Sequence, residues 1–295
     1  MDNDSYLLLL LSDGNLPTGS FVSSSGLESY FKHGFPAIER ISLSDPSASQ
    51  APASIVGFIR DSLAAYARLA LPFASDAHNT MENAVEKGKD ATIAGLQALD
   101  RHYEAMSLNH ITRRASKAQG VALLTLFSKG FSRPTWLDAF NPSQMDAIGS
   151  RRKEEAKQRL SETVVDAYKL MIRKGEAPGH LPICWGVLSA ALSLSTGRSK
   201  QLFLFLYARS LLSAAIRLNA IGPYAAQQLL LHVIRQMVDE EASNCSHLTS
   251  LPSEGPPFEE DWSRLESSST PATTWPLGEI LAARHDLQHS RIFNS

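Results

Sequence analysis

The stretch IVGFIRDSLAAYARLA, residues 55–70, decides the fold class. Its apolar side chains recur at intervals of three and four residues, at Ile55, Ile59, Leu63, Tyr66 and Ala70. This spacing gathers them on one face of a helix, whereas a half-buried strand would alternate apolar and polar residues. The stretch therefore predicts an amphipathic α-helix.

The same spacing recurs through most of the chain. Leu160, Val164, either Ala167 or Tyr168, and Met171 follow it. Similar patterns, separated by Gly, Pro or Asp/Ser clusters, cover 76–87, 90–107, 110–129, 181–195, 199–218 and 223–242. Strand-like alternation is nearly absent, and no period repeats as it would in a solenoid. We predict an all-α protein: a single helical-bundle domain of roughly ten helices.

Three segments interrupt this regularity, at 42–54, 132–152 and 244–276. The last is rich in Ser, Thr and Pro and has too few apolar residues to pack. Helical spacing returns over 277–289. We therefore expect a helical domain over 1–243, a mobile linker over 244–276, and a C-terminal partner-binding segment over 277–295 that acts as a docking tail.

The composition argues against several classes of protein. The formal net charge is −2, from 28 basic and 30 acidic residues, so no strong overall field attracts nucleic acid or an anionic membrane. Two cysteines are too few for a secreted disulfide scaffold. The longest uncharged apolar stretch, 181–197, is shorter than the ~20 residues of a bilayer span. We expect a cytoplasmic protein without nucleic acid or membrane partners.

One loop imitates a nucleotide-binding motif. In SDGNLPTGSF, residues 12–21, Gly14 and Gly19 have the spacing of P-loop glycines, but Ser20 stands where the phosphate-binding lysine belongs. We interpret the stretch as a turn that precedes a short helix over 26–33, capped by Ser23, Ser24 or Ser25. Because no nucleophile motif such as GxSxG occurs either, we expect no catalytic residue and no enzymatic activity.

Two pairs of residues suit a metal ion. His285 and His289 are four residues apart, as are His180 and Cys184, and each pair lacks an evident third ligand. Cys184 adjoins Trp185 in an apolar run, which favours a buried thiol. We expect no metal site and no cofactor, with a helical metal-binding protein that uses these His/Cys pairs as the alternative.

A polar stripe marks the predicted helix at 199–218. Arg209, Ser213 and Arg217 follow one another at four-residue intervals on an otherwise apolar helix. The stripe is either the hydrated edge of a core helix or a pair of guanidinium groups directed at carboxylates of a partner.

Five blocks of sequence, in order, resemble the UreF family of urease accessory proteins. They are LSDGNLPTGSFVSSSGLE (11–28), NHITRRASKAQGVALL (109–124), GHLPICWGVLSAALSLS (179–195), SAAIRLNAIGPYAAQQLL (213–230) and SRIFNS (290–295). Pro223 and Ala226 depart from the pattern usual in bacterial members and are closer to plant or fungal ones.

The resemblance implies a non-catalytic role. Members of the family are all-helical and dimeric. They bind a urease accessory protein of D type, also called H type, and the accessory GTPase of G type. The complex docks on apo-urease and helps to deliver nickel to it, so the resemblance implies a homodimeric adaptor.

The resemblance also implies site residues. In the partner-binding segment over 277–295, the residues that would contact the D-type partner are Ser290, Arg291, Ile292 and Phe293. Of the first block, Phe21, Ser25, Gly26 and Glu28 would shape the dimer and partner surface. Arg217 would face the GTPase.

Overall fold

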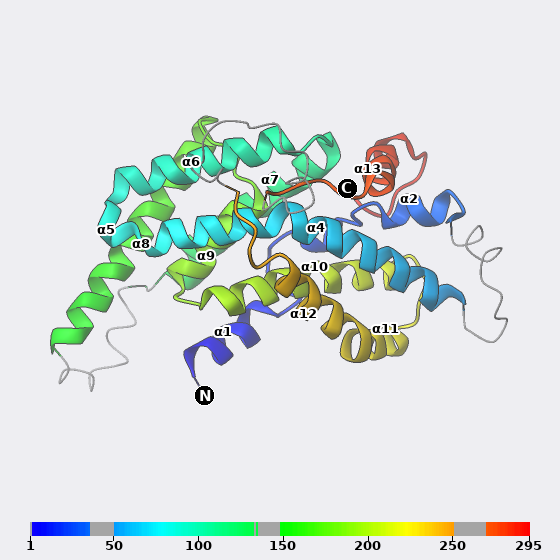
Figure 1. Ribbon diagram of the computed structural model, residues 1–295, viewed down its shortest axis with the longest axis horizontal. Helices are drawn as coiled ribbons and strands as arrows, with labels where there is room; N and C mark the ends of the chain where they lie inside the picture. Colours follow the sequence, from blue (N-terminus) through cyan, green and yellow to red (C-terminus); the bar gives the residue numbers. More distant parts are fainter. Residues whose placement is uncertain (1, 36–49, 133, 135–147, 251–269) are drawn as a thin grey trace, which may run out of the picture.

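The computed structural model describes residues 2–35, 50–132, 134, 148–250 and 270–295. Helices and turns, without strands, make up these described residues, which confirms the predicted all-α fold (Figure 1). The helical elements, with the short 3₁₀ and π segments marked η, are α1 (Asn3–Leu11), η1 (Ser20–Val22), α2 (Leu27–Lys32), α4 (Gln50–Glu82), α5 (Ala84–Lys87), α6 (Lys89–Met106), α7 (His110–Leu126), η2 (Phe127–Phe131), α8 (Ile148–Lys174), α9 (Leu181–Ala191), α10 (Thr196–Arg217), α11 (Pro223–Leu229), η4 (Leu230–Ile234), α12 (Arg235–Asn244), α13 (Pro276–Ala283) and η6 (Arg284–Leu287).

The long helix α4 runs through the length of the bundle (Figure 1). The sequence pattern predicted two helices here, separated near Pro72, and this is wrong: Pro72 lies inside one helix. An interior proline costs about 3 kcal/mol. Its neighbours Leu71 and Phe73 are fully buried, and burial of each such side chain contributes about 1.5–3 kcal/mol. Packing therefore outweighs the proline.

Two segments that the sequence predicted to be irregular, 42–54 and 132–152, are partly helical. Residues 50–54 belong to α4 and residues 148–152 to α8. Of the expected linker, residues 251–269 lie outside the described part of the chain. Residue 244 ends α12, and the backbone and hydroxyl of Ser250 both donate to the Asp76 carboxylate on α4. The chain is thus fixed to the bundle as far as residue 250.

Helix α9 lies at the centre of the bundle, in contact with α4, α7, α8 and α10. It is apolar on nearly every side, and its residues from Pro182 to Ala190 are buried. Gly186 permits its close approach to α4, because a Cβ there would lie 2.7 Å from the backbone nitrogen of His78. Cys184 is fully buried, as predicted, and burial raises the pKa of its thiol.

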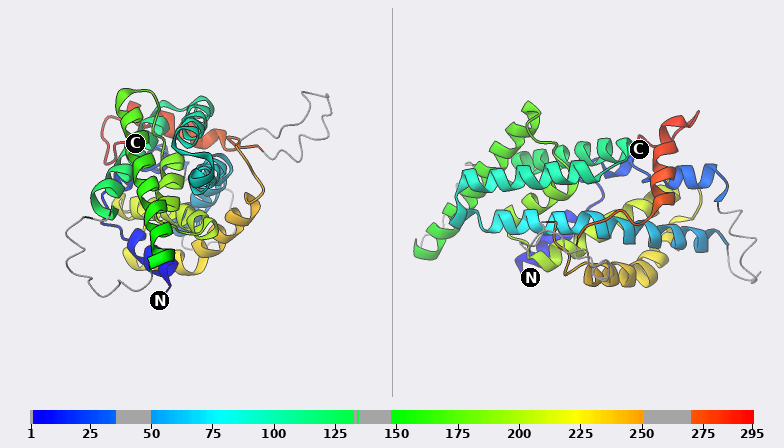
Figure 2. Two further views of the ribbon diagram at one scale, coloured as in Figure 1. Left: turned by 90° about the vertical axis from the view of Figure 1, so that its left-hand side faces the viewer. Right: turned by 45° about the horizontal axis from the view of Figure 1, so that its top comes forward.

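Helix α2, with the residues just before it, and the C-terminal region meet at one end of the bundle. Helices α2 and α13 lie together there, and both Figure 1 and Figure 2 show α13 and the segment after it beside α2 and α7. No helix in the described ranges is long and apolar enough to cross a membrane. The fold therefore brings the first and last sequence blocks into contact.

Candidate functional site

The candidate site is the contact between residues 11–28, called here the opening motif, and residues 270–295, called the C-terminal segment. We call this contact the joint. It is built around backbone carbonyls, one buried carboxylate and several arginines.

Two arginines of α10 hold the opening motif. Arg209 donates to the carbonyl of Ser12, and Arg217 donates to the carbonyl of Phe21. The Arg217 guanidinium also lies over the ring of Phe293, with its carbon 4.4 Å from the ring centre, which is a cation–π contact. Burial lowers the pKa of Arg217. In this structure both guanidinium groups of the predicted polar stripe therefore bind atoms of their own chain.

The opening motif turns through left-handed backbone conformations. Ser25 has a φ of +48° and Gly26 a φ of +87°, and Gly26 is the N-cap residue of α2. The predicted serine cap is therefore wrong, since no side chain caps this helix. A Cβ at position 26 would also lie 3.3 Å from the backbone nitrogen of Ala282, so glycine lets α13 approach closely.

Glu28 is the central group of the joint. Its carboxylate is fully buried and accepts the backbone N–H groups of Ile292 at 2.9 Å and Phe293 at 3.3 Å. Lys32, one helical turn along α2, lies 3.1 Å from the same carboxylate and donates to the carbonyl of Ser290. The buried charge is thus compensated by a cation and two amides, as burial of a carboxylate requires.

The backbones of the two chain regions also pair directly. Asn294 donates its N–H to the carbonyl of Val22 at 2.8 Å, and Ser24 donates to the carbonyl of Ser295 at 2.6 Å. These bonds fix the register of the C-terminal segment along the opening motif.

Helix α7 supplies a second set of charges. Arg114 donates to both carboxylate oxygens of Asp286 at 3.1 Å and to the carbonyl of Asn294 at 3.0 Å. Arg291 donates to the same carboxylate at 2.5 Å. Hydrogen bonds from Arg114, helped by Arg291, hold the pKa of the Asp286 carboxyl well below its usual range. Asn109, the N-cap residue of α7, donates to the carbonyl of Glu279 at 2.9 Å.

The predicted site residues meet at this joint but differ in exposure. Phe21 and Ile292 are 59% and 61% exposed, and Ser290 and Arg291 are exposed too. Phe293, by contrast, is buried beneath Arg217. Three further exposed apolar side chains come from α13, η6 and the residues just before α7: Ile280, Leu287 and Leu108.

Sequence reasoning missed Asp286 and His285 as members of the joint. The His285 ring is fully buried, with Nε2 3.7 Å from Glu28 and Nδ1 3.5 Å from Asp286, and neither nitrogen forms a hydrogen bond. The spacing of His285 and His289 suggested only a metal pair. No sequence signal showed that Glu28, more than 250 positions away, faces the ring.

In the other candidate metal pair, His180 belongs to a polar network. The Nε2 atom of His180 lies 2.5 Å from Glu104, and Nδ1 lies 3.1 Å from the hydroxyl of Ser116, which accepts the N–H of Leu181. Because an ionised Glu104 carboxylate can only accept a hydrogen bond, Nε2 carries the proton donated to it, and in the neutral ring Nδ1 accepts the proton of the Ser116 hydroxyl. Burial lowers the pKa of His180. Among the described residues, no three His, Cys, Asp or Glu side chains are grouped to hold a metal ion.

Comparisons with known proteins give a consistent result. The model of the family described as UreF matches residues 50–234. The chain is 42% identical to "Urease accessory protein 6" of Cryptococcus neoformans, over 98% of this chain and 96% of the relative. It is 27% identical to "Uncharacterized urease accessory protein UreF-like" of Schizosaccharomyces pombe, over 99% and 97%. It is 26% identical to "Urease accessory protein UreF" of Paenarthrobacter aurescens, over 97% and 95%.

Proposed function

The chain belongs to the UreF family of urease accessory proteins, and from this premise we propose that it is a non-catalytic adaptor in the complex that delivers nickel to apo-urease. Family membership makes it a helper in urease maturation rather than urease itself. The proposed adaptor links an accessory protein of D/H type to the accessory GTPase of G type, as a homodimer within the complex.

The observation that carries this proposal is the joint. Two regions at opposite ends of the sequence form one surface, on which exposed apolar side chains stand beside exposed arginines. Exposed apolar groups with polar neighbours are characteristic of protein interaction sites, and aromatic, aliphatic and arginine side chains dominate binding energies. Buried Glu28 and Phe293 hold the two regions of this surface together.

We propose distinct roles for the residues of the joint. Ser290, Arg291 and Ile292 contact the D/H-type partner directly, because their side chains are exposed. Phe293, being buried, contributes by holding the segment in the binding conformation. Phe21 lies on the partner surface, while Ser25, Gly26 and Glu28 shape it. Arg217 positions the face that is turned toward the GTPase.

Copurification with the D/H-type partner tests the proposal. Deletion of residues 285–295 and the point change Ile292→Asp should each abolish or strongly reduce complex formation. Leu170→Asp is the matched control, since Leu170 is 49% exposed on α8 and is not part of the joint. Undiminished partner binding by the truncated chain would refute docking through the C-terminal segment.

A second measurement tests the adaptor role itself. Urease activity should be lost in cells that lack this protein and restored by the full chain but not by Ile292→Asp. Metal analysis of the purified protein, with His180→Ala and His285→Ala for comparison, tests the metal-binding alternative. Stoichiometric nickel or zinc that is lost in these variants would favour that alternative.

A further inference from the structure

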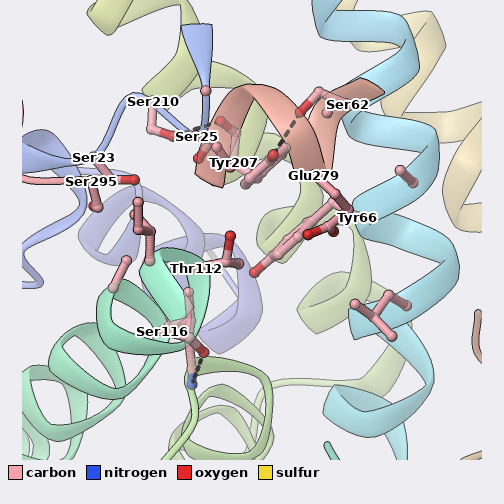
Figure 3. Close-up of a pocket in the computed structure, with 18 of the residues that line it drawn as sticks. Ser23, Ser25, Ser62, Tyr66, Thr112, Ser116, Tyr207, Ser210, Glu279 and Ser295 are labelled. Carbon is pink, nitrogen blue, oxygen red and sulfur yellow. Dashed lines mark hydrogen bonds between the residues drawn. The ribbon is translucent and has the colours of Figure 1, made fainter. Parts of the chain in front are cut away.

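A cavity of about 130 Å³ lies between α4, α7, α10 and α13, beside the joint (Figure 3). Thr112 and Thr273 line it and are also exposed, so the cavity opens to solvent on that side. A cavity of about 150 Å³ in another protein holds benzene, so this one has room for a ligand of about five non-hydrogen atoms. The chemistry of its lining determines which ligand of that size fits.

The lining has one carboxylate side chain and no compensating cation. Glu279, on α13, is half-buried and lines the cavity (Figure 3). Burial raises the pKa of its carboxyl, because the charged form is poorly solvated there. Among the described residues that line the cavity, none is Lys, Arg or His. A cationic ligand would therefore supply the opposite charge that this carboxylate lacks.

Aromatic rings form much of the remaining lining. They belong to four elements of the fold: Tyr66 lies on α4, Tyr103 on α6, Tyr207 on α10, and Trp275 is the N-cap residue of α13. The rings of Tyr66 and Tyr207 stack with their centres 3.9 Å apart, and Trp275 packs edge-on against Phe58. These contacts fix the rings in place. Because the face of an aromatic ring attracts cations, organic ammonium ions bind in sites lined by several rings.

Hydroxyl groups add hydrogen-bond acceptors to the lining. Ser210 donates its proton to the carbonyl of Tyr207, so its oxygen only accepts further bonds. The hydroxyls of Ser62 and Tyr207 lie 2.7 Å apart and share one hydrogen bond, which leaves lone pairs on the donor oxygen. An N–H group of a cation can donate to such oxygens, whereas an anion finds no cationic side chain in this lining.

We propose that the cavity binds a small organic ammonium ion, with its charged nitrogen directed at Glu279 and its alkyl groups against Tyr66, Tyr207 and Trp275. A primary or methylated amine of about five non-hydrogen atoms, protonated at neutral pH, meets this description. The inference concerns the isolated chain and does not rest on the proposed adaptor function.

Titration of the full chain, followed by saturation-transfer difference NMR, tests the site with two probes of the same shape. tert-Butylammonium and tert-butanol differ in charge but not in the number of non-hydrogen atoms. We expect tert-butylammonium to bind with a Kd of about 1 mM, as suits so small a ligand, and tert-butanol to bind at least about tenfold more weakly. Equal affinities, or no binding of tert-butylammonium at about 10 mM, would overturn the proposal.

Two carboxylate variants locate the charge that is recognised. Glu279→Gln keeps the size of the side chain and the backbone carbonyl to which Asn109 donates, and it should weaken tert-butylammonium binding about tenfold. Glu241→Gln is the matched control. Burial also raises the pKa of the Glu241 carboxyl, but this residue lies on α12 and is not part of the lining. An unchanged affinity in Glu279→Gln, or an equal loss in both variants, would overturn the proposal.

A second pair of variants tests the rings. Tyr66→Leu removes one aromatic face and should weaken tert-butylammonium binding about fivefold. Tyr224→Leu is the control, because Tyr224 is 87% exposed on α11 and does not line the cavity. An unchanged affinity in Tyr66→Leu would place the ligand elsewhere and overturn the proposal. If a variant does not fold, the comparison of the two probes on the native protein still decides.

Discussion

The contact between α4 and α9 and the joint between the opening motif and the C-terminal segment are built by different physical means. Between α4 and α9, apolar side chains and a glycine bring two helices together, and Leu71, Phe73, Ile183 and Val187 are completely buried. At the joint, most contacts are polar: they are made by one buried carboxylate, four cationic side chains and a few backbone hydrogen bonds.

The difference predicts different responses. Apolar packing is insensitive to salt but sensitive to volume, since interiors are densely packed. Exposed ion pairs respond to salt and pH, and they open without global unfolding. The α4–α9 contact should therefore set the stability of the domain, while the joint sets the conformation of its interaction surface.

The largest effect is expected at Gly186. Gly186→Val places methyl groups against the α4 backbone and should lower the free energy of unfolding by about 3 kcal/mol, as overpacked cores do. Gly57→Val is the control, because no atom lies within 4 Å of a Cβ there and the change should stay below about 1 kcal/mol. Urea unfolding followed by circular dichroism measures both. Equal effects at the two glycines would contradict the tight α4–α9 contact.

A smaller effect is expected at Phe293. Phe293→Ala removes a buried ring and its contact with Arg217, but the loss is limited by the free energy with which the segment is docked, so we expect about 2 kcal/mol. Amide hydrogen exchange should accelerate over 276–295 and stay unchanged in α9. Phe293→Leu keeps most of the apolar volume and should recover much of the protection. Faster exchange throughout the bundle would show that the joint is not a separate unit.

The pH dependence of stability should come partly from His180. Because burial lowers its pKa, the folded protein holds this ring neutral, while the unfolded chain binds a proton below about pH 6.5. The unfolded state then binds more protons, so stability is lost as pH falls below that value. The urea midpoint should drop between pH 7.5 and 5.5, and His180→Gln should reduce the drop. His232 is exposed, so His232→Gln is the control and should leave the drop in midpoint unchanged. If the drop were the same in His180→Gln as in the native protein, His180 would not be the cause of the pH dependence.

Helical periodicity was enough to predict the all-α fold, because amphipathic spacing reflects burial directly. The prediction of a helix end near Pro72 was wrong, because tertiary packing overrides a local helix breaker there. The prediction of a serine cap at Ser23, Ser24 or Ser25 was wrong because Gly26, in a left-handed conformation, is the N-cap residue. The family resemblance pointed to Glu28, Arg217 and Phe293. The spacing of those residues along the chain gave no indication that the three meet, because such contacts depend on how the bundle brings distant segments together.

The smallest expected effect is that of salt, which should act on the joint and leave the α4–α9 contact unchanged. Asp286 is 29% exposed and Arg114 is 53% exposed, so the ion pair between them is partly screened by dissolved ions. Raising the salt concentration from 0.05 M to 0.5 M should speed amide exchange over 276–295 by about threefold, the range expected of exposed pairs. Exchange in α9 should not change, because its contacts are apolar. In Arg114→Gln the salt effect should shrink, whereas Arg113→Gln should keep it. If salt left amide exchange in the segment unchanged, the Arg114–Asp286 pair would not contribute to docking. The buried bonds to Glu28 would then hold the segment in place.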